Sequence, residues 1–122
     1  MRIKLILPYP PSELLLNKHT HWRVKADATN LARIDAYYMA FDQGAHRNKP
    51  MASVALDITF YPPKGRVADT DSLYGALKPI IDGGLVDAGI IKDDSPKVIK
   101  LVSLHVGEKS DNPRTEITVE EV

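Results

Sequence analysis

The chain has 122 residues, of which 43% are hydrophobic and 26% are charged; this length and balance predict one folded domain over residues 1–122 and exclude disordered and fibrous proteins. No segment approaches the ~18 apolar residues of a membrane span, and the first eight residues are too short and too mixed for a signal peptide, so we expect a cytoplasmic protein with no membrane partner. The formal net charge is zero, which by itself argues against a polyanionic partner such as nucleic acid.

The first half of the chain contains the patterns of two strands and one helix. Residues 2–7 alternate basic and apolar side chains, which predicts a half-buried strand that ends at Pro8. An irregular stretch follows through Trp22, and residues 27 to about 43 are then predicted to form a helix, with Asp27 as N-cap and large apolar residues at helical spacing: Leu31, Ile34, Tyr38 and Phe41. Strict alternation over residues 54–61 predicts the second strand.

The second half is predicted to contain a helix and two further strands. The helix covers residues 71 to about 88, and Pro79 should bend or divide it, because proline lacks a backbone donor and crowds the preceding turn. Its inward side chains are predicted to be Leu73, Leu77, Ile80, Ile81 and Leu85. Alternation returns in residues 97–106 and 115–119. The order β-α-β-α-β-β predicts a two-layer α+β domain with its helices packed on a mixed sheet.

Two acidic segments are candidates for a metal site. Asp69 and Asp71 precede the second helix; in an extended backbone, residues two apart point to the same side, and Asp71 is also a plausible N-cap. Asp93 and Asp94 end the loop after that helix. The chain has no cysteine, so a metal would be held by carboxylates or histidines, and carboxylates without positive partners usually bind Mg²⁺ or Mn²⁺. Taken singly, each segment is more typical of an ordinary structural role than of a metal site: a turn and a helix cap for Asp69 and Asp71, and a solvated loop for Asp93 and Asp94.

Lys78 is the cation nearest to the first acidic segment within the predicted helix. Asp71, Gly75, Lys78 and Asp82 follow a spacing that places them on one helix face, so Lys78 is expected to reach toward the carboxylates past a residue without a side chain. The alternative is a simple surface ion pair between Lys78 and Asp82.

The basic residues gather in the first part of the chain. Residues 1–68 hold ten Lys/Arg against five Asp/Glu, whereas residues 69–122 hold six against eleven, so the zero net charge conceals a basic and an acidic part. Phosphate contacts and base stacking are predicted for a set of basic and aromatic residues: Lys18, Trp22, Arg23, Lys25, Lys64 and Arg66. For Trp22 the open alternative is that it anchors a long loop to the core.

Three segments resemble the RusA-like family of crossover-junction endodeoxyribonucleases, the small Holliday junction resolvases of phages and prophages. Residues 7–12 (LPYPPS) are similar to the opening motif of that family. Residues 69–71 (DTD) resemble its D-x-D-N signature, and residues 82–96 (DGGLVDAGIIKDDSP) resemble the segment that ends in its second acidic motif. The three occur in the family's order and span nearly the whole chain.

This resemblance implies a small α+β domain that forms a homodimer and cleaves branched DNA, above all four-way junctions, in DNA recombination and repair. It further implies Mg²⁺ as cofactor, with Mn²⁺ as an expected substitute, held by Asp69, Asp71 and Asp94, with Asp93 as the alternative third ligand. The sequence departs from the family at two positions: Ser72 replaces the usual Asn, and Gly75 stands where the catalytic Lys is common, which leaves Lys78 as its nearest replacement.

Two other functions stay open at this point. One is a nuclease that prefers flaps, forks or nicked DNA, because no feature of the sequence distinguishes a four-way junction from other branched DNA. The other is a prophage DNA-binding dimer that has lost its activity through the changes at positions 72 and 75. For the dimer interface, the sequence offers an exposed apolar sheet face or the N-terminal strand.

Overall fold

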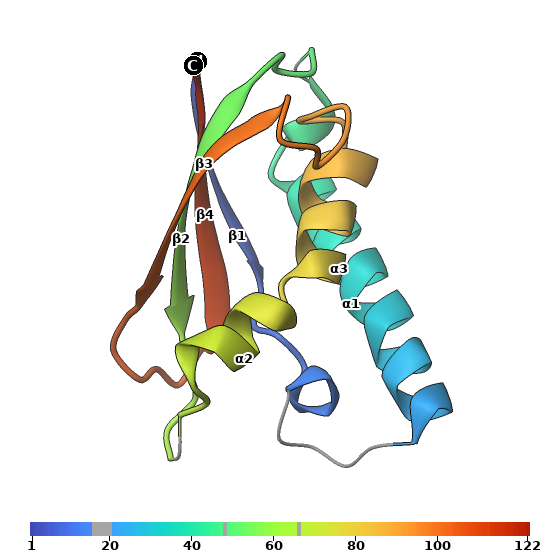
Figure 1. The fold of residues 1–122 in the computed structure, drawn as a ribbon, viewed down its shortest axis with the longest axis vertical. Helices are drawn as coiled ribbons and strands as arrows, with labels where there is room; N and C mark the ends of the chain where they lie inside the picture. Colours follow the sequence, from blue (N-terminus) through green and yellow to red (C-terminus); the bar gives the residue numbers. More distant parts are fainter. Residues whose placement is uncertain (16–20, 48, 66) are drawn as a thin grey trace.

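A computed structural model describes residues 1–15, 21–47, 49–65 and 67–122 of the chain. It has an α+β fold in which a four-stranded sheet forms one layer and helices cover one of its faces (Figure 1). The strands are β1 (Arg2–Pro8), β2 (Val54–Tyr61), β3 (Ile99–Val106) and β4 (Arg114–Glu121). The helices are α1 (Trp22–Asp42), α2 (Thr70–Gly75) and α3 (Lys78–Ile81), and a π-helical segment, Asp82–Asp87, continues α3. No described helix combines the length and apolarity needed to cross a membrane.

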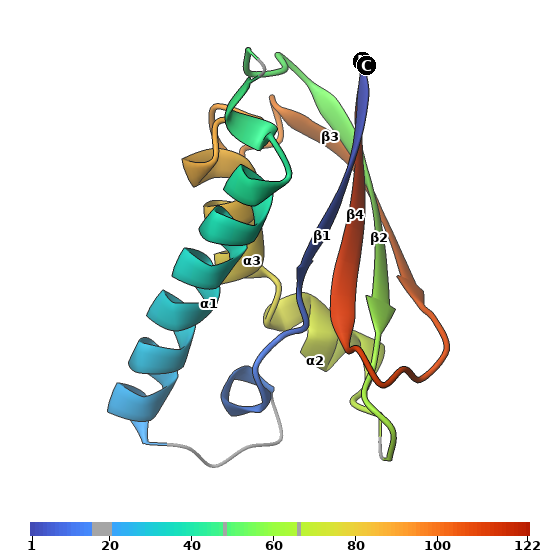
Figure 2. The same ribbon diagram turned by 180° about the vertical axis from the view of Figure 1, so that it is seen from behind.

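The sheet is mixed, as the sequence predicts. Its strand order is β1-β4-β2-β3; β4 pairs antiparallel with both β1 and β2, and β2 pairs parallel with β3. Because β1 and β4 are antiparallel neighbours, the two chain termini lie side by side, at the end of the sheet away from α2 (Figures 1 and 2). There the Glu121 amide donates to the Met1 carbonyl at 2.9 Å.

Strand alternation divides the sheet into an apolar inner face and a polar outer face. The buried inward side chains include Leu5, Leu56, Ile58, Phe60 and Ile117. The outer face carries ion pairs, Lys4 with Glu116 at 3.0 Å and His105 with Asp57 at 2.9 Å. This face therefore does not provide the apolar dimer surface that the sequence suggested.

The free edge of β1 is covered by one side chain. The Gln43 amide oxygen accepts from the Ile6 backbone N–H at 2.8 Å, and its amide nitrogen donates to the Ile6 carbonyl at 2.7 Å. Gln43 thus makes the two hydrogen bonds that a neighbouring strand would make, which blocks strand addition at this point. The backbone groups of Ile6, one residue of the seven in β1, are therefore not open to a second strand.

Helix α1 differs from its prediction in its start, and its large apolar side chains lie on the side away from the core. It begins at Trp22 rather than at residue 27, and its N-cap is His21, whose Nδ1 accepts from the Arg23 N–H at 3.2 Å, so Asp27 lies inside the helix. The buried side chains are the alanines, Ala32, Ala36 and Ala40. The large apolar residues Leu31, Ile34, Tyr38 and Phe41 are 40–60% exposed. The spacing of these apolar residues correctly predicted a helix, but their side chains point away from the core.

A close contact between helices explains why the small side chains face inward. A Cβ atom added at Gly83 in the π-helical segment would lie 1.9 Å from the carbonyl oxygen of Arg33 in α1. The two backbones approach so closely that only a residue without a side chain fits at position 83. Alanines on the facing side of α1 permit the same approach.

The region predicted as one helix over residues 71–88 consists of three segments. Helix α2 ends at Gly75, and Pro79 lies in the first turn of α3, where a missing N–H costs no hydrogen bond. The predicted division at Pro79 is confirmed, and Leu73, Leu77, Ile80 and Leu85 are buried as predicted, while Ile81 is partly buried. Because the helix is interrupted, Asp71 and Lys78 do not share the face of one continuous helix.

We expect Asp87→Asn to lower the melting temperature at neutral pH and to have less effect in acid. Arg33 Nε donates to Asp87 Oδ2 at 2.6 Å and its terminal nitrogen to Oδ1 at 2.8 Å, which joins α1 to the π-helical segment. This bonding holds the pKa of Asp87 below its ordinary value. A carboxyl whose pKa is lowered by folding stabilises the protein above its unfolded pKa, about 3.9, and loses that contribution as the pH falls through the folded pKa.

Thermal unfolding of the wild type and the variant, each at pH 7 and at pH 3, measures this difference. Since both partners are largely exposed, the effect at pH 7 is expected to be small. A melting-temperature difference that is the same at both pH values would contradict the prediction.

Candidate functional site

The first acidic segment lies at the start of α2. Asp69 is the N-cap residue with extended backbone angles (φ −63°, ψ 152°), but its side chain makes no capping hydrogen bond. Asp71, expected as the N-cap, is instead in the first turn, where its Oδ1 accepts from the Ser72 N–H at 3.0 Å. The helix begins at Thr70, so the side-by-side arrangement expected of an extended D-x-D does not apply here. Both aspartates are exposed.

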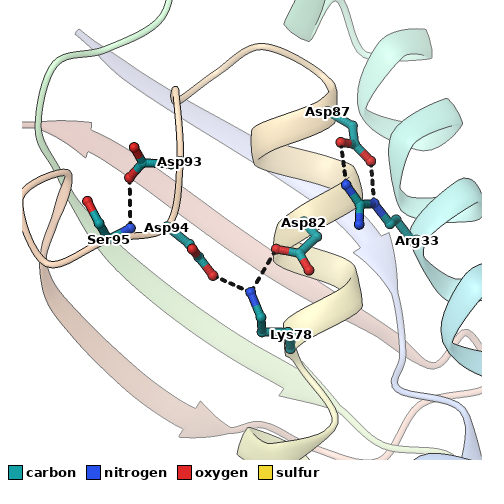
Figure 3. Close-up of polar contacts among 7 residues, drawn as sticks. All are labelled: Arg33, Lys78, Asp82, Asp87, Asp93, Asp94 and Ser95. Carbon is teal, nitrogen blue, oxygen red and sulfur yellow. Dashed lines mark hydrogen bonds and ion pairs between the residues drawn. The ribbon is translucent and has the colours of Figure 1, made fainter.

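The second acidic segment meets α3 through Lys78 (Figure 3). Lys78 Nζ lies 2.5 Å from Asp94 Oδ2 and 3.1 Å from Asp82 Oδ1, so one ammonium bridges two carboxylates. The hydrogen bond to Asp94, followed by the one to Asp82, raises the pKa of Lys78 above its ordinary value. The surface pair with Asp82 expected from the sequence is present, and Asp94 is added to it from sixteen residues away.

Asp93 and Asp94 have different surroundings. Asp93 Oδ1 accepts from the Ser95 N–H at 2.9 Å, and hydrogen bonding by Ser95 lowers the pKa of Asp93. In Figure 3 the Asp94 carboxylate points to Lys78, whereas the Asp93 carboxylate is engaged within its own loop. Of the two, Asp94 is the one directed toward α3.

A cavity of about 440 Å³ adjoins this ion pair. Gly75, Lys78 and Asp94 contribute to its wall, together with apolar and aromatic side chains: Tyr74, Leu77, Ile81, Pro96, Ile99 and Val102. Tyr74 is 54% exposed and had no place in the sequence interpretation, although its position four residues before Lys78 was the available signal.

The acidic residues that the structure describes do not form a complete set of metal ligands. Among the residues that the structure describes, no three side chains of Asp, Glu or His lie close enough together to hold a metal ion. Asp94 is engaged by Lys78, whose ammonium supplies the positive charge that a metal would supply. The carboxylates of Asp69, Asp71 and Asp94 are oxygen donors of the kind that Mg²⁺ takes, but Asp94 would have to exchange its contact with Lys78 for one with the metal.

The predicted DNA-binding residues fall into two described groups. At the start of α1, Trp22 is 66% exposed, and the Arg23 guanidinium lies 5.3 Å from its ring centroid, so Trp22 does not anchor a loop to the core. After β2, Lys64 forms an exposed pair with Asp111 at 3.0 Å. Lys25 lies in the first turns of α1, and Lys18 and Arg66 lie outside the described residues.

The first acidic segment, Asp69 and Asp71, lies at the same end of the molecule as the start of α1 and the loop after β2. In both Figure 1 and Figure 2, the first turn of α1, the loop after β2 and helix α2 lie at the lower end. Exposed cations at Arg23 and Lys64 therefore lie at the same end as Asp69 and Asp71. At this end of the molecule, residues from the basic and from the acidic part of the sequence therefore lie together.

Comparison with known proteins gives one informative similarity. No protein-family model matches the chain. An uncharacterized protein of Xylella fastidiosa is 35% identical over 91 residues, which cover 73% of this chain and 59% of that protein. The chain thus spans about three fifths of the length of this relative, whose name states no activity.

Proposed function

We propose that the protein is a RusA-like, Mg²⁺-dependent endodeoxyribonuclease that acts as a homodimer in the cytoplasm on branched DNA, with four-way junctions as its substrate. The contact between Lys78 and Asp94 carries this proposal. It joins the second acidic segment to the helical region that follows Asp69 and Asp71. Exposed aromatic and basic residues at the same end of the fold offer contacts for bases and phosphates.

Each residue has a role in this proposal. Lys78, paired with two carboxylates, would face the scissile phosphate and stabilise the charge that develops on it. Trp22 and Arg23 would hold DNA by stacking and by phosphate contact, and Lys64 by phosphate contact. Asp69, Asp71 and Asp94 would be the metal ligands, with Asp93 held back by its own loop. Bound Mg²⁺ would supply activation of water and stabilisation of the leaving oxygen.

Incubation with a labelled synthetic four-way junction tests the proposal. We expect symmetrical cleavage with Mg²⁺, slower or similar cleavage with Mn²⁺, and none in EDTA. Flap, fork, nicked and linear duplexes of the same sequence serve as matched substrates. Equal or faster cutting of the flap or fork would replace junction resolution by a broader branched-DNA nuclease, and no cutting of any substrate with either metal would contradict a nuclease.

A DNA-binding dimer without nuclease activity is the second candidate. The acidic residues of the described chain favour it, because no three of them lie close enough together to hold a metal ion. This function requires junction binding in Ca²⁺ or EDTA together with no cleavage in Mg²⁺ or Mn²⁺. Cleavage that disappears in Asp71→Asn would exclude it.

A further inference from the structure

Helix α1 exposes an apolar stripe on the side away from the core, interrupted by the exposed Asp27 between Val24 and Leu31. Its members are Val24, Leu31, Ile34, Tyr38 and Phe41, with exposed fractions of 46%, 60%, 49%, 60% and 40%. The opposite side of the helix is buried through Ala32, Ala36 and Ala40. Single exposed apolar residues are ordinary, but five in one line along a helix mark a surface that is covered by a partner.

The spacing of the stripe identifies the partner as another helix. Its successive members are 7, 3, 4 and 3 residues apart, which is the seam of a helix pair packed side by side. A helix of 21 residues is about 31 Å long, so the seam runs along most of its length. Beside it lie two hollows. One, of about 410 Å³, is lined in part by Val24, Leu31 and Tyr9; the other, of about 480 Å³, is lined by Ile34, Tyr37 and Tyr38 with Arg33 and Asp87.

The charges of α1 indicate that the partner helix is a second copy in the opposite direction. The first turn of α1 contains no acidic residue and the last turn no basic one. Instead two basic residues and one acidic residue, Arg23, Lys25 and Asp27, lie near the start, and two acidic residues, Asp35 and Asp42, lie toward the end, where no basic residue follows Arg33. This is the reverse of what the helix dipole favours. A second α1 running antiparallel places an acidic end beside each basic end and opposes the two dipoles, so the surface is complementary to itself about a two-fold axis.

We propose that two copies of the chain dimerise by antiparallel packing of α1 against α1, with the stripe as the seam. The inference rests on the homodimer of the proposed function and names the surface that forms it. The Arg23 and Trp22 ends then lie at opposite ends of the dimer seam. The polar outer face of the sheet stays exposed in this arrangement.

Sedimentation velocity at micromolar concentration, without DNA or metal, tests the seam. Leu31→Glu and Tyr38→Glu place a charge on the stripe, whereas Leu101→Glu, on β3, makes the same change as Leu31→Glu at a leucine that is also 60% exposed. We expect the wild type and Leu101→Glu to sediment as dimers, and the two stripe variants to be monomers with the circular dichroism of the wild type. A monomeric wild type, or stripe variants that stay dimeric, would overturn the inference.

The direction of packing is measured with a spin label at residue 42. The chain has no cysteine, so Asp42→Cys provides one labelling site per copy. Antiparallel packing centred near the middle of the stripe separates the two labels by about 25 Å along the axis, whereas parallel packing brings them within about 10 Å. Labels at the short distance would overturn the antiparallel arrangement. The seam and the proposed function can fail separately. If the wild type is a dimer and Leu31→Glu is a monomer, the seam is supported even when no DNA is cut. If the wild type is a monomer, the seam is contradicted even when junctions are cleaved.

Discussion

Replacement of Gly83 by alanine is expected to lower the free energy of unfolding by about 3 kcal/mol or more, one of the larger effects available to a single methyl group. The new Cβ would lie 1.9 Å from the Arg33 carbonyl oxygen, which belongs to the backbone of α1 and cannot turn aside as a side chain can. The π-helical segment and α1 would have to separate. This would also disturb the bidentate contact between Arg33 and Asp87. Urea unfolding followed by circular dichroism measures the loss.

Gly75→Ala is the matched control for this prediction. A Cβ at position 75 would meet no heavy atom within 4 Å, and Gly75 lies in the last turn of α2 without a positive φ. Alanine is favoured over glycine in a helix by about 0.5–1 kcal/mol, so this variant should match or exceed the wild-type stability. If Gly83→Ala unfolds at the same urea concentration as Gly75→Ala, the close approach of the two helices is wrong.

Asp71→Asn is expected to reduce junction cleavage at least about a hundredfold, while the protein still binds the junction in Ca²⁺. Asparagine keeps the size of the side chain and an oxygen that accepts from the Ser72 N–H, so α2 should begin as before. It removes the negative charge that a hard divalent cation requires. Single-turnover cleavage and a gel-shift titration measure the two quantities separately.

The control for this prediction is Asp57→Asn. Asp57 pairs with His105 on the outer face of the sheet at 2.9 Å and is exposed, so its loss should leave cleavage unchanged. Undiminished cutting by Asp71→Asn would remove Asp71 from the proposed metal ligands. An equal loss in both variants would point to a general effect of charge on DNA binding.

The sheet could be predicted from the sequence because alternation is a local property. Residues 54–61 form β2 within their predicted bounds, and β1 and β4 extend slightly beyond theirs. The orientation of α1 could not be predicted, because periodicity identifies a stripe of large side chains but not the side on which the core lies. Here the core side is set by Gly83, fifty residues after Arg33, which leaves room only for alanines.

The residues of the candidate site could be predicted from the sequence, but the contacts between them could not. The acidic segments and Lys78 stand out by residue type, but the contact of Lys78 with Asp94 depends on how the loop after the π-helical segment returns to α3. Helix α2 starts at Thr70, so Asp69 and Asp71 do not have the extended arrangement that the sequence predicted. The break after Gly75 also separates Asp71 from Lys78, which were predicted to share one helix face. Small shifts in helix bounds thus matter more for the site than for the fold.

The adjacent termini of β1 and β4 have a practical consequence for work with this protein. Both ends of the chain emerge at the end of the sheet away from α2, Trp22 and Lys64 (Figures 1 and 2). An affinity tag, a fluorophore or a surface tether at either terminus would leave the basic end of the molecule facing solution. Protein immobilised through either terminus would therefore have the same orientation in the test of DNA binding.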